Sequence, residues 1–80
     1  MKFSALGDPT RLRILAQLED GERCVCDLLE EIGVAANLLS YHLRILREAG
    51  LVTATRRGRW MDYRLDDLGV QALRAALPGP

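Results

Sequence analysis

Apolar residues recur every three or four positions through the first fifty residues, a spacing typical of amphipathic helices. The first stripe follows Asp8-Pro9, where aspartate is a favourable N-cap and proline suits the first helical turn. Gly33 and Gly50 follow the next two stripes, and glycine is favoured just beyond a helix end. These signals predict a stub of helix at residues 2–6, a helix from Pro9 that closes at Asp20-Gly21, and helices over residues 22–32 and 36–49.

The period changes from helical to alternating after the third long helix. Two strands are expected, at residues 51–55 and 59–65, joined by a turn at residues 56–58, and a last helix over residues 67–77. One face of the second strand then carries Trp60, Asp62 and Arg64, and the other carries Met61, Tyr63 and Leu65.

Two helices joined by a short glycine-bearing turn and followed by a hairpin with an arginine-rich tip are typical of a winged helix-turn-helix. We therefore expect an α+β fold that is mainly α, with a two-stranded β-wing and terminal dimerisation helices. Residues 1–80 form a single domain in this interpretation, which combines DNA binding and sensing. A small helical bundle that carries a hairpin is the alternative.

The composition is that of a globular protein, with 49% hydrophobic and 28% charged residues. It excludes a disordered tail, a fibrous protein and a membrane protein, and without a signal peptide we expect a cytoplasmic chain. The net charge is zero, but residues 1–40 hold 4 basic and 7 acidic side chains, whereas residues 41–80 hold 7 basic and 4 acidic ones. The positive half contains the third helix and the hairpin. A local excess of arginine indicates nucleic-acid binding, although a solvated charged face has the same composition.

The third helix and the hairpin tip supply the candidate DNA contacts. On the helix, Asn37 can pair with adenine, Arg44 with guanine or phosphate, and two hydroxyls with phosphates, while Leu38 can touch a thymine methyl or simply be exposed. The hairpin arginines would lie on phosphates or in the minor groove. The full candidate set is Asn37, Leu38, Ser40, Tyr41, Arg44, Arg56, Arg57 and Arg59. His42, beside the core stripe, is expected to be a hydrogen-bonded structural histidine rather than a metal ligand.

Cys24 and Cys26 are the only two cysteines, which are too few for a disulfide framework. Inside a helix over residues 22–32 they flank the core stripe and remain partly accessible, but residues two apart do not face each other. One soft ion bound by both sulfurs would therefore have to distort the helix. Thiolates select thiophilic centres: As(III) or Sb(III) needs few ligands, Cd(II) or Pb(II) needs further ones, and zinc wants four. A disulfide that acts as a redox switch is the weaker rival.

Four segments in order resemble the ArsR/SmtB family of metal-sensing repressors: ALGDPTRLRIL at residues 5–15, CVCDL at 24–28, SYHLRILREAGLV at 40–52 and GRWMDYRL at 58–65. The resemblance implies a homodimeric winged-helix repressor, not an enzyme, that leaves its operator when a metal(loid) binds Cys24 and Cys26. No permanently bound cofactor is implied. A thiol-dependent enzyme is disfavoured also by the absence of a Cys-x-x-Cys pair and a nucleotide-binding loop.

Departures from the family pattern narrow the choice of inducer. Leu29 stands where the arsenic-type sensor box often has a third cysteine, and the chain begins too late for the cysteine-bearing extension of the cadmium/lead type. Gly69 stands where the zinc-type site has a histidine. As(III) or Sb(III) is the expected inducer and Cd(II) or Pb(II) the alternative, with the third ligand left open.

The last helix is apolar on two sides, so that it needs two partners to cover it. One side is expected to face its own core and the other a second subunit. Two recognition helices about 34 Å apart would then read a pseudo-palindromic operator. The expected dimer interface comprises Phe3, Leu6, Val70, Leu73 and Leu77.

Overall fold

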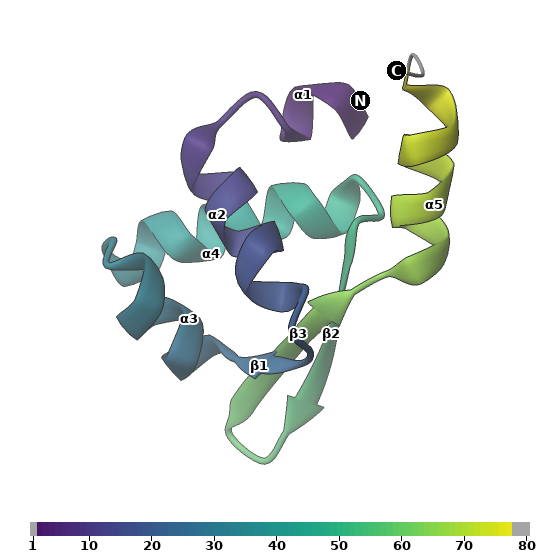
Figure 1. The fold of residues 1–80 in the computed structure, drawn as a ribbon. Coiled ribbons are helices and arrows are strands. Elements are labelled where there is room, and N and C mark those ends of the chain that lie inside the picture. The colour runs from purple at the N-terminus through teal and green to yellow at the C-terminus, as the bar shows by residue number, and fades with distance from the viewer. Residues whose placement is uncertain (1, 78–80) are drawn as a thin grey trace.

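The computed structural model describes residues 2–77, with the side chains of residues 4–77. Five helices and three short strands form an elongated body of 39 × 22 × 21 Å, with the wing at one end and α1 and α5 at the other (Figure 1). In chain order the elements are α1 (Lys2–Ala5), α2 (Pro9–Leu18), β1 (Arg23–Cys24), α3 (Val25–Ile32), α4 (Ala36–Glu48), β2 (Val52–Arg57), β3 (Trp60–Leu65) and α5 (Asp67–Ala76).

The predicted helix ends follow the expected local chemistry. The Asp8 carboxylate caps α2 by accepting from the backbone N–H of Thr10 at 2.7 Å, and Pro9 occupies the first helical position. Gly33 ends α3 in the left-handed conformation at φ 73°, where a side chain would be strained. The helix-turn-helix is therefore confirmed, with α4 as the second helix of the motif.

The start of the second predicted helix is wrong. Residues 22–24 are not helical, because Arg23 and Cys24 form the short strand β1, and α3 begins only at Val25. β1 pairs antiparallel with β3 in the register Arg23↔Tyr63 and Cys24↔Asp62. The wing is thus part of a three-stranded sheet in the order β1-β3-β2, rather than an isolated two-stranded hairpin.

The hairpin turn lies later than predicted. The register ends at Arg57↔Trp60, so that Gly58 and Arg59 alone form the loop. Gly58 has φ 60°, as the favoured two-residue hairpin loops require. Arg56 therefore belongs to β2 instead of the turn, and it projects from the opposite face to Arg57 because side chains alternate along a strand.

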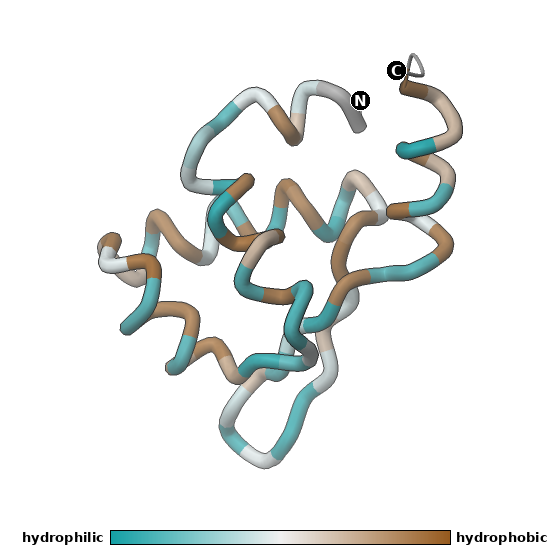
Figure 2. Tube along the Cα trace, viewed as in Figure 1, coloured by the Kyte–Doolittle hydropathy of each residue, from teal (hydrophilic) through white to brown (hydrophobic). Residues whose placement is uncertain are grey.

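The core lies among α2, α3, α4 and the base of the wing. Figure 2 shows hydrophobic segments recurring along the three helices with hydrophilic segments between them. The largest side chains that are fully buried in this core are Ile14, Leu18, Leu28, Leu39, Leu43, Leu46 and Leu51.

One histidine and one arginine tie the N-terminal segment to this core. His42 is 4% exposed, and its Nδ1 accepts from the Arg11 guanidinium at 3.2 Å. Arg11 also donates to the carbonyl oxygens of Ala5 and Ser4 at the end of α1. The expectation of a structural, hydrogen-bonded histidine is confirmed, whereas the clamp by Arg11 was not foreseen.

The last helix packs unusually closely on the loop after α4. An ideal Cβ built on Gly69 would lie 1.7 Å from the carbonyl oxygen of Gly50, so no other residue fits at position 69 without a backbone shift. Asp66 caps α5 by accepting from the Gly69 N–H at 2.9 Å. The glycine where the zinc-type site has a histidine is thus required by packing. Among the described residues, no helix has the length and apolar character to cross a membrane.

Candidate nucleic-acid interface and thiol site

The helix α4, which is the expected recognition helix, has a buried face and a solvent-exposed face, as its sequence period predicts. Leu39, Leu43 and Leu46 are buried. Every candidate DNA contact on this helix is exposed, including Leu38 and Tyr41, which are 41% and 47% exposed. The Arg44 guanidinium lies over the Tyr41 ring, 5.9 Å from its centroid, so the two side chains support each other on the wet face. We call the exposed side chains of Asn37, Leu38, Ser40, Tyr41 and Arg44 the reading face.

The N-terminal end of α4 has no side-chain cap. Ala35 is the N-cap residue and makes no side-chain hydrogen bond to the helix. The first N–H groups of a helix have no partner within the helix, and they carry the positive end of its dipole. An uncapped helix start next to Asn37 is therefore suited to a phosphate oxygen.

The three wing arginines have different surroundings. Arg59 lies in the loop and makes no hydrogen bond or ion pair with another described residue, and Arg56 donates to the Gly58 carbonyl at 3.4 Å. Arg57 instead donates from Nε to the Asp62 carboxylate at 2.8 Å, and its terminal nitrogen lies 3.7 Å from the Glu22 carboxylate. Arg56 and Arg59 are thus the freer candidates for DNA, while Arg57 is engaged within the protein.

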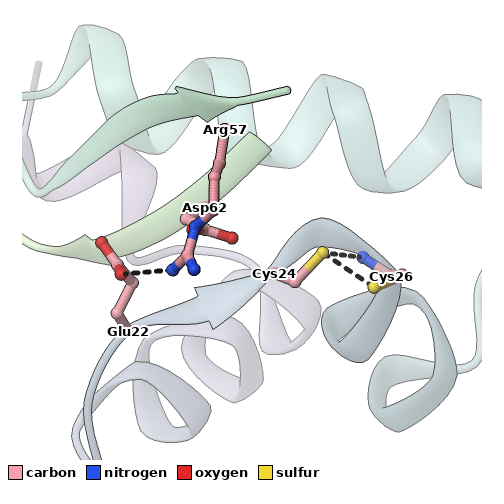
Figure 3. A network of polar contacts seen from close by, with 5 residues as sticks. All are labelled: Glu22, Cys24, Cys26, Arg57 and Asp62. Atoms are coloured by element: carbon pink, nitrogen blue, oxygen red, sulfur yellow. Dashed lines mark hydrogen bonds and ion pairs between the residues drawn. The ribbon is translucent and has the colours of Figure 1, made fainter. Parts of the chain in front are cut away.

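The Glu22–Arg57–Asp62 network joins the wing to the strand that carries the first cysteine. In Figure 3 the Arg57 guanidinium lies between the two carboxylates, beside β1. Asp62 is 7% exposed, although strand alternation places it with Trp60 and Arg64 on the solvent face. It is buried because β1 flanks it and Arg57 reaches across from β2. The sequence does contain a signal for this contact, because Arg57 and Asp62 occupy diagonal positions on one face of the hairpin. The signal was missed because the turn was predicted at residues 56–58, which placed Arg57 outside the strand.

The two thiols lie together, contrary to the prediction. Cys24 is the N-cap residue of α3, not a residue within the helix, and its Sγ accepts from the Cys26 N–H at 3.4 Å. The Cys26 thiol donates to the same sulfur at 2.7 Å, and both cysteines are free (Figure 3). The extended conformation of Cys24 turns its side chain back over the first turn of α3. One soft centre can therefore contact both sulfurs without any distortion of a regular helix.

The thiol pair is accessible from solvent. Cys24 is half-buried and Cys26 is exposed, as expected for positions at the margin of the core. The hydrogen bond to Cys24 raises the pKa of the Cys26 thiol above its ordinary value, and partial desolvation adds to the rise. A ligand that forms bonds to both sulfurs must therefore displace the Cys26 proton.

No complete metal-binding cluster surrounds the pair. Among the described residues, no three His, Cys, Asp or Glu side chains are grouped closely enough to hold a metal ion. The donor set is two soft sulfurs, which fits a thiophilic centre of low coordination number and does not fit a four-ligand zinc site.

The predicted dimer residues have mixed surroundings. Leu6 and Val70 are half-buried and Leu77 is 42% exposed, whereas the side chain of Phe3 lies outside the described part of the structure. Leu73, which was assigned to the expected dimer interface, is 7% exposed and packs in the chain's own core. The opposite side of α5 is the open one, with Leu68 at 79% exposure.

Known proteins are similar to this chain in both sequence and fold. The chain is 47% identical over 73 residues to the arsenical resistance operon repressor of Bacillus subtilis, which covers 90% of this chain and 70% of that protein. The crystal structure of a possible transcriptional regulator for arsenical resistance superposes with a TM-score of 0.87 at 40% identity, over 92% of this chain and 77% of that one.

A solution structure of a homodimeric winged helix-turn-helix DNA-binding domain from Mycobacterium bovis superposes with a TM-score of 0.78 at 31% identity, over 94% of this chain and 74% of that one. Residues 8–54, from the cap of α2 into β2, match the family described as bacterial regulatory protein, arsR family. With its winged helix-turn-helix, exposed reading face and arginine-bearing wing, the chain belongs to the ArsR family of DNA-binding transcriptional regulators, which are not enzymes.

Proposed function

We propose that this chain is a homodimeric transcriptional repressor that leaves a pseudo-palindromic DNA operator when a thiophilic metal(loid) binds Cys24 and Cys26. As(III) or Sb(III) is the preferred inducer class. The observation that carries the proposal is the place of the thiol pair: two sulfurs 2.7 Å apart at the start of α3, the helix that precedes the recognition helix. The names of the relatives support it, since one is an arsenical resistance operon repressor and another is described as homodimeric.

The thiol pair has two connections to the DNA-facing surface. Cys24 pairs with Asp62 of β3, which continues to the wing tip. At its C-terminal end, α3 is connected to α4 by the short segment after Gly33. A change in the conformation of Cys24 is therefore transmitted to the wing through the sheet and to the reading face through the helix-turn-helix.

Inducer binding would remove the contacts that Cys24 and Cys26 make with each other. The thiol hydrogen bond is lost with the Cys26 proton, and the Cys24 sulfur becomes a poorer acceptor for the Cys26 N–H. Both contacts lie at the junction between the end of β1 and the start of α3. By linkage, an inducer that favours the rearranged form weakens DNA binding by the same factor as DNA weakens inducer binding.

An operator titration tests the proposal. A binding sequence is selected from a random duplex pool, and its affinity for the reduced protein is measured by fluorescence anisotropy with and without arsenite or antimonite. We expect the inducer to weaken binding by about tenfold or more, within the usual range of allosteric coupling. Equal affinity in both conditions would contradict the proposal, and sedimentation of the protein alone would test the dimer.

Serine substitutions provide a matched control. Cys24→Ser keeps an oxygen that can cap α3, whereas Cys24→Ala removes both the cap and the thiol. Both variants should lose the inducer response, but only Cys24→Ala should also lose helix stability, by about 0.5–1 kcal/mol in a denaturant titration. An undiminished response in Cys24→Ser and Cys26→Ser would exclude the thiol pair as the sensor.

Two alternatives are distinguished by the same protein samples. Cd(II) or Pb(II) needs ligands beyond the two sulfurs, so a preference for these ions in the titration would indicate donors from a second subunit. A redox switch is favoured by the closeness of the sulfurs. Release of DNA by a mild oxidant, reversed by dithiothreitol and without any response to arsenite, would favour it over metalloid sensing.

A further inference from the structure

The outer half of the wing extends past the strand that supports its base. β1 pairs with Tyr63 and Asp62 of β3, and beyond Asp62 the wing continues as a two-stranded ribbon to the loop after Arg57. A ribbon of two strands is at best marginally stable in water. The direction of the wing tip therefore depends on side-chain contacts with the rest of the protein.

Arg57, in the last strand pair before the loop, supplies such contacts. Its Nε donates to the Asp62 carboxylate at 2.8 Å, and a terminal nitrogen lies 3.7 Å from the Glu22 carboxylate, just before β1. The guanidinium thus connects both strands of the wing with the segment that leads into β1 (Figure 3). The planar fork of an arginine can serve two carboxylates at once, whereas a lysine ammonium is a single point charge.

The position of Asp62 makes this contact costly to break. Its side chain is 9% exposed, and among the described residues Arg57 is its hydrogen-bond partner. A buried carboxylate that loses its partner costs the full desolvation penalty of a charged group. Arg57 therefore cannot turn to a DNA phosphate without leaving Asp62 unpaired. Neither Arg56 nor Arg59 pairs with a carboxylate among the described residues, so these two are under no such constraint.

We propose that Arg57 is a positioning residue of the DNA interface rather than a DNA contact. By pairing with Asp62 and Glu22, it holds the wing tip in the orientation at which the neighbouring arginines, Arg56 and Arg59, meet the duplex. The inference rests on the proposed function, since it takes operator DNA as the partner of the wing. It reassigns one arginine that the sequence indicated as a DNA contact, and it gives two acidic side chains a role in binding a polyanion.

Removal of an acidic charge separates positioning from direct contact by the sign of the effect. Loss of a negative charge normally strengthens DNA binding, and an arginine freed to contact a phosphate would steepen the salt dependence by about one unit of slope. If Arg57 positions the wing, Asp62→Asn should instead weaken operator binding by about tenfold, and the more exposed Glu22→Gln by about threefold. The affinity of the selected operator is measured by fluorescence anisotropy over a range of salt concentrations.

Asp27→Asn is the matched control for these two variants. Asp27 lines the same pocket as the Glu22–Arg57–Asp62 network, but it forms no ion pair with another described residue. Its substitution removes the same charge from the same part of the surface. Operator affinity should therefore stay unchanged or rise slightly.

Arg57→Lys tests the geometry of the contact at constant charge. A lysine still serves as a phosphate contact, but it has no fork with which to bridge two carboxylates. Trp60, the only tryptophan, lies opposite Arg57 in the strand register, so its fluorescence reports on the wing tip without DNA. Arg57→Lys and Asp62→Asn should both weaken operator binding and increase the quenching of Trp60 by acrylamide, whereas Asp27→Asn should change neither in this direction.

The outcomes for this inference and for the proposed function differ. Tighter operator binding with a steeper salt dependence in Asp62→Asn, or undiminished affinity in Arg57→Lys, would make Arg57 a DNA contact and overturn the inference. Weakened binding with unchanged quenching of Trp60 would overturn it as well, because the wing tip has then not moved. Glu22 is exposed, so Glu22→Gln decides the question if Asp62→Asn unfolds in a urea titration. A wild-type protein that selects no DNA sequence would instead overturn the proposed function.

Discussion

The helices of this protein begin in two different ways, and the difference follows their roles. The scaffold helices α2 and α5 start with Asp8 and Asp66, whose carboxylates accept backbone N–H groups. The helices α3 and α4, which carry the candidate site residues, start with a sulfur at Cys24 and with Ala35, which provides no side-chain cap. A carboxylate cap holds a helix end as long as the carboxylate is ionised, whereas a sulfur cap can be removed by a soft ligand and an uncapped end can accept a phosphate.

The largest effect should come from disturbing the fixed end of α5. Gly69→Ala places a methyl group against the Gly50 carbonyl, where an ideal Cβ would be 1.7 Å away. The helix must move, and we expect a loss of about 3 kcal/mol in the free energy of unfolding, measured by urea denaturation. Gln71→Ala, at an exposed position of the same helix, is the control and should be nearly neutral. Equal stability of both variants would show that α5 is not anchored through this contact.

A charged cap on the open end of α4 should weaken DNA binding. Ala35→Asp supplies the missing cap but places a negative charge where a phosphate would bind, so we expect about a 30-fold loss of operator affinity, or about 2 kcal/mol. Ala35→Ser caps the helix without adding charge, so it should lose less operator affinity than Ala35→Asp. Both variants should be at least as stable as wild type to heat. Unchanged affinity in Ala35→Asp would mean that the start of α4 does not face the DNA backbone.

The smallest effect is the dependence of the α5 cap on pH. The Gly69 N–H, and then the Thr53 hydroxyl, lower the pKa of the Asp66 carboxyl below its ordinary value of 3.8. Because the folded-state pKa is lowered, the ionised carboxylate stabilises the fold above the unfolded pKa, and this contribution is lost as pH falls through the folded pKa. Asp66→Asn should therefore melt below wild type at pH 7.

The melting temperatures of wild type and Asp66→Asn should then converge as the pH falls below about 4. A difference that stays constant from pH 7 to pH 3 would contradict this account of the α5 cap.

The sequence predicted what depends on local signals. Asp8-Pro9, Gly33 and Gly50 mark helix ends by their own backbone preferences, and the leucine period of α4 correctly predicted which of its faces is buried and which is exposed. The strand β1 was missed because two residues carry no periodicity and their partners lie far along the chain, in β3. Tertiary pairing decided their conformation.

That one error changed the interpretation of the candidate site. With the helix extended back to residue 22, Cys24 and Cys26 diverge on its surface. With Cys24 as the N-cap, the same two residues meet at 2.7 Å. Likewise the burial of Asp62 depends on the approach of β1 and Arg57, which no pattern within β3 encodes. The candidate residues could be named from the sequence, but their geometry depends on the sheet.

The contact between Arg11 and His42 has a practical consequence for spectroscopy. A guanidinium has no lone pair, so the neutral imidazole must accept at Nδ1 and keep its proton on Nε2. The chain has a single histidine, so one pair of ring ¹⁵N shifts reports this tautomer without overlap. Those two resonances therefore report whether the N-terminal segment stays in contact with α4 when the proposed inducer is added.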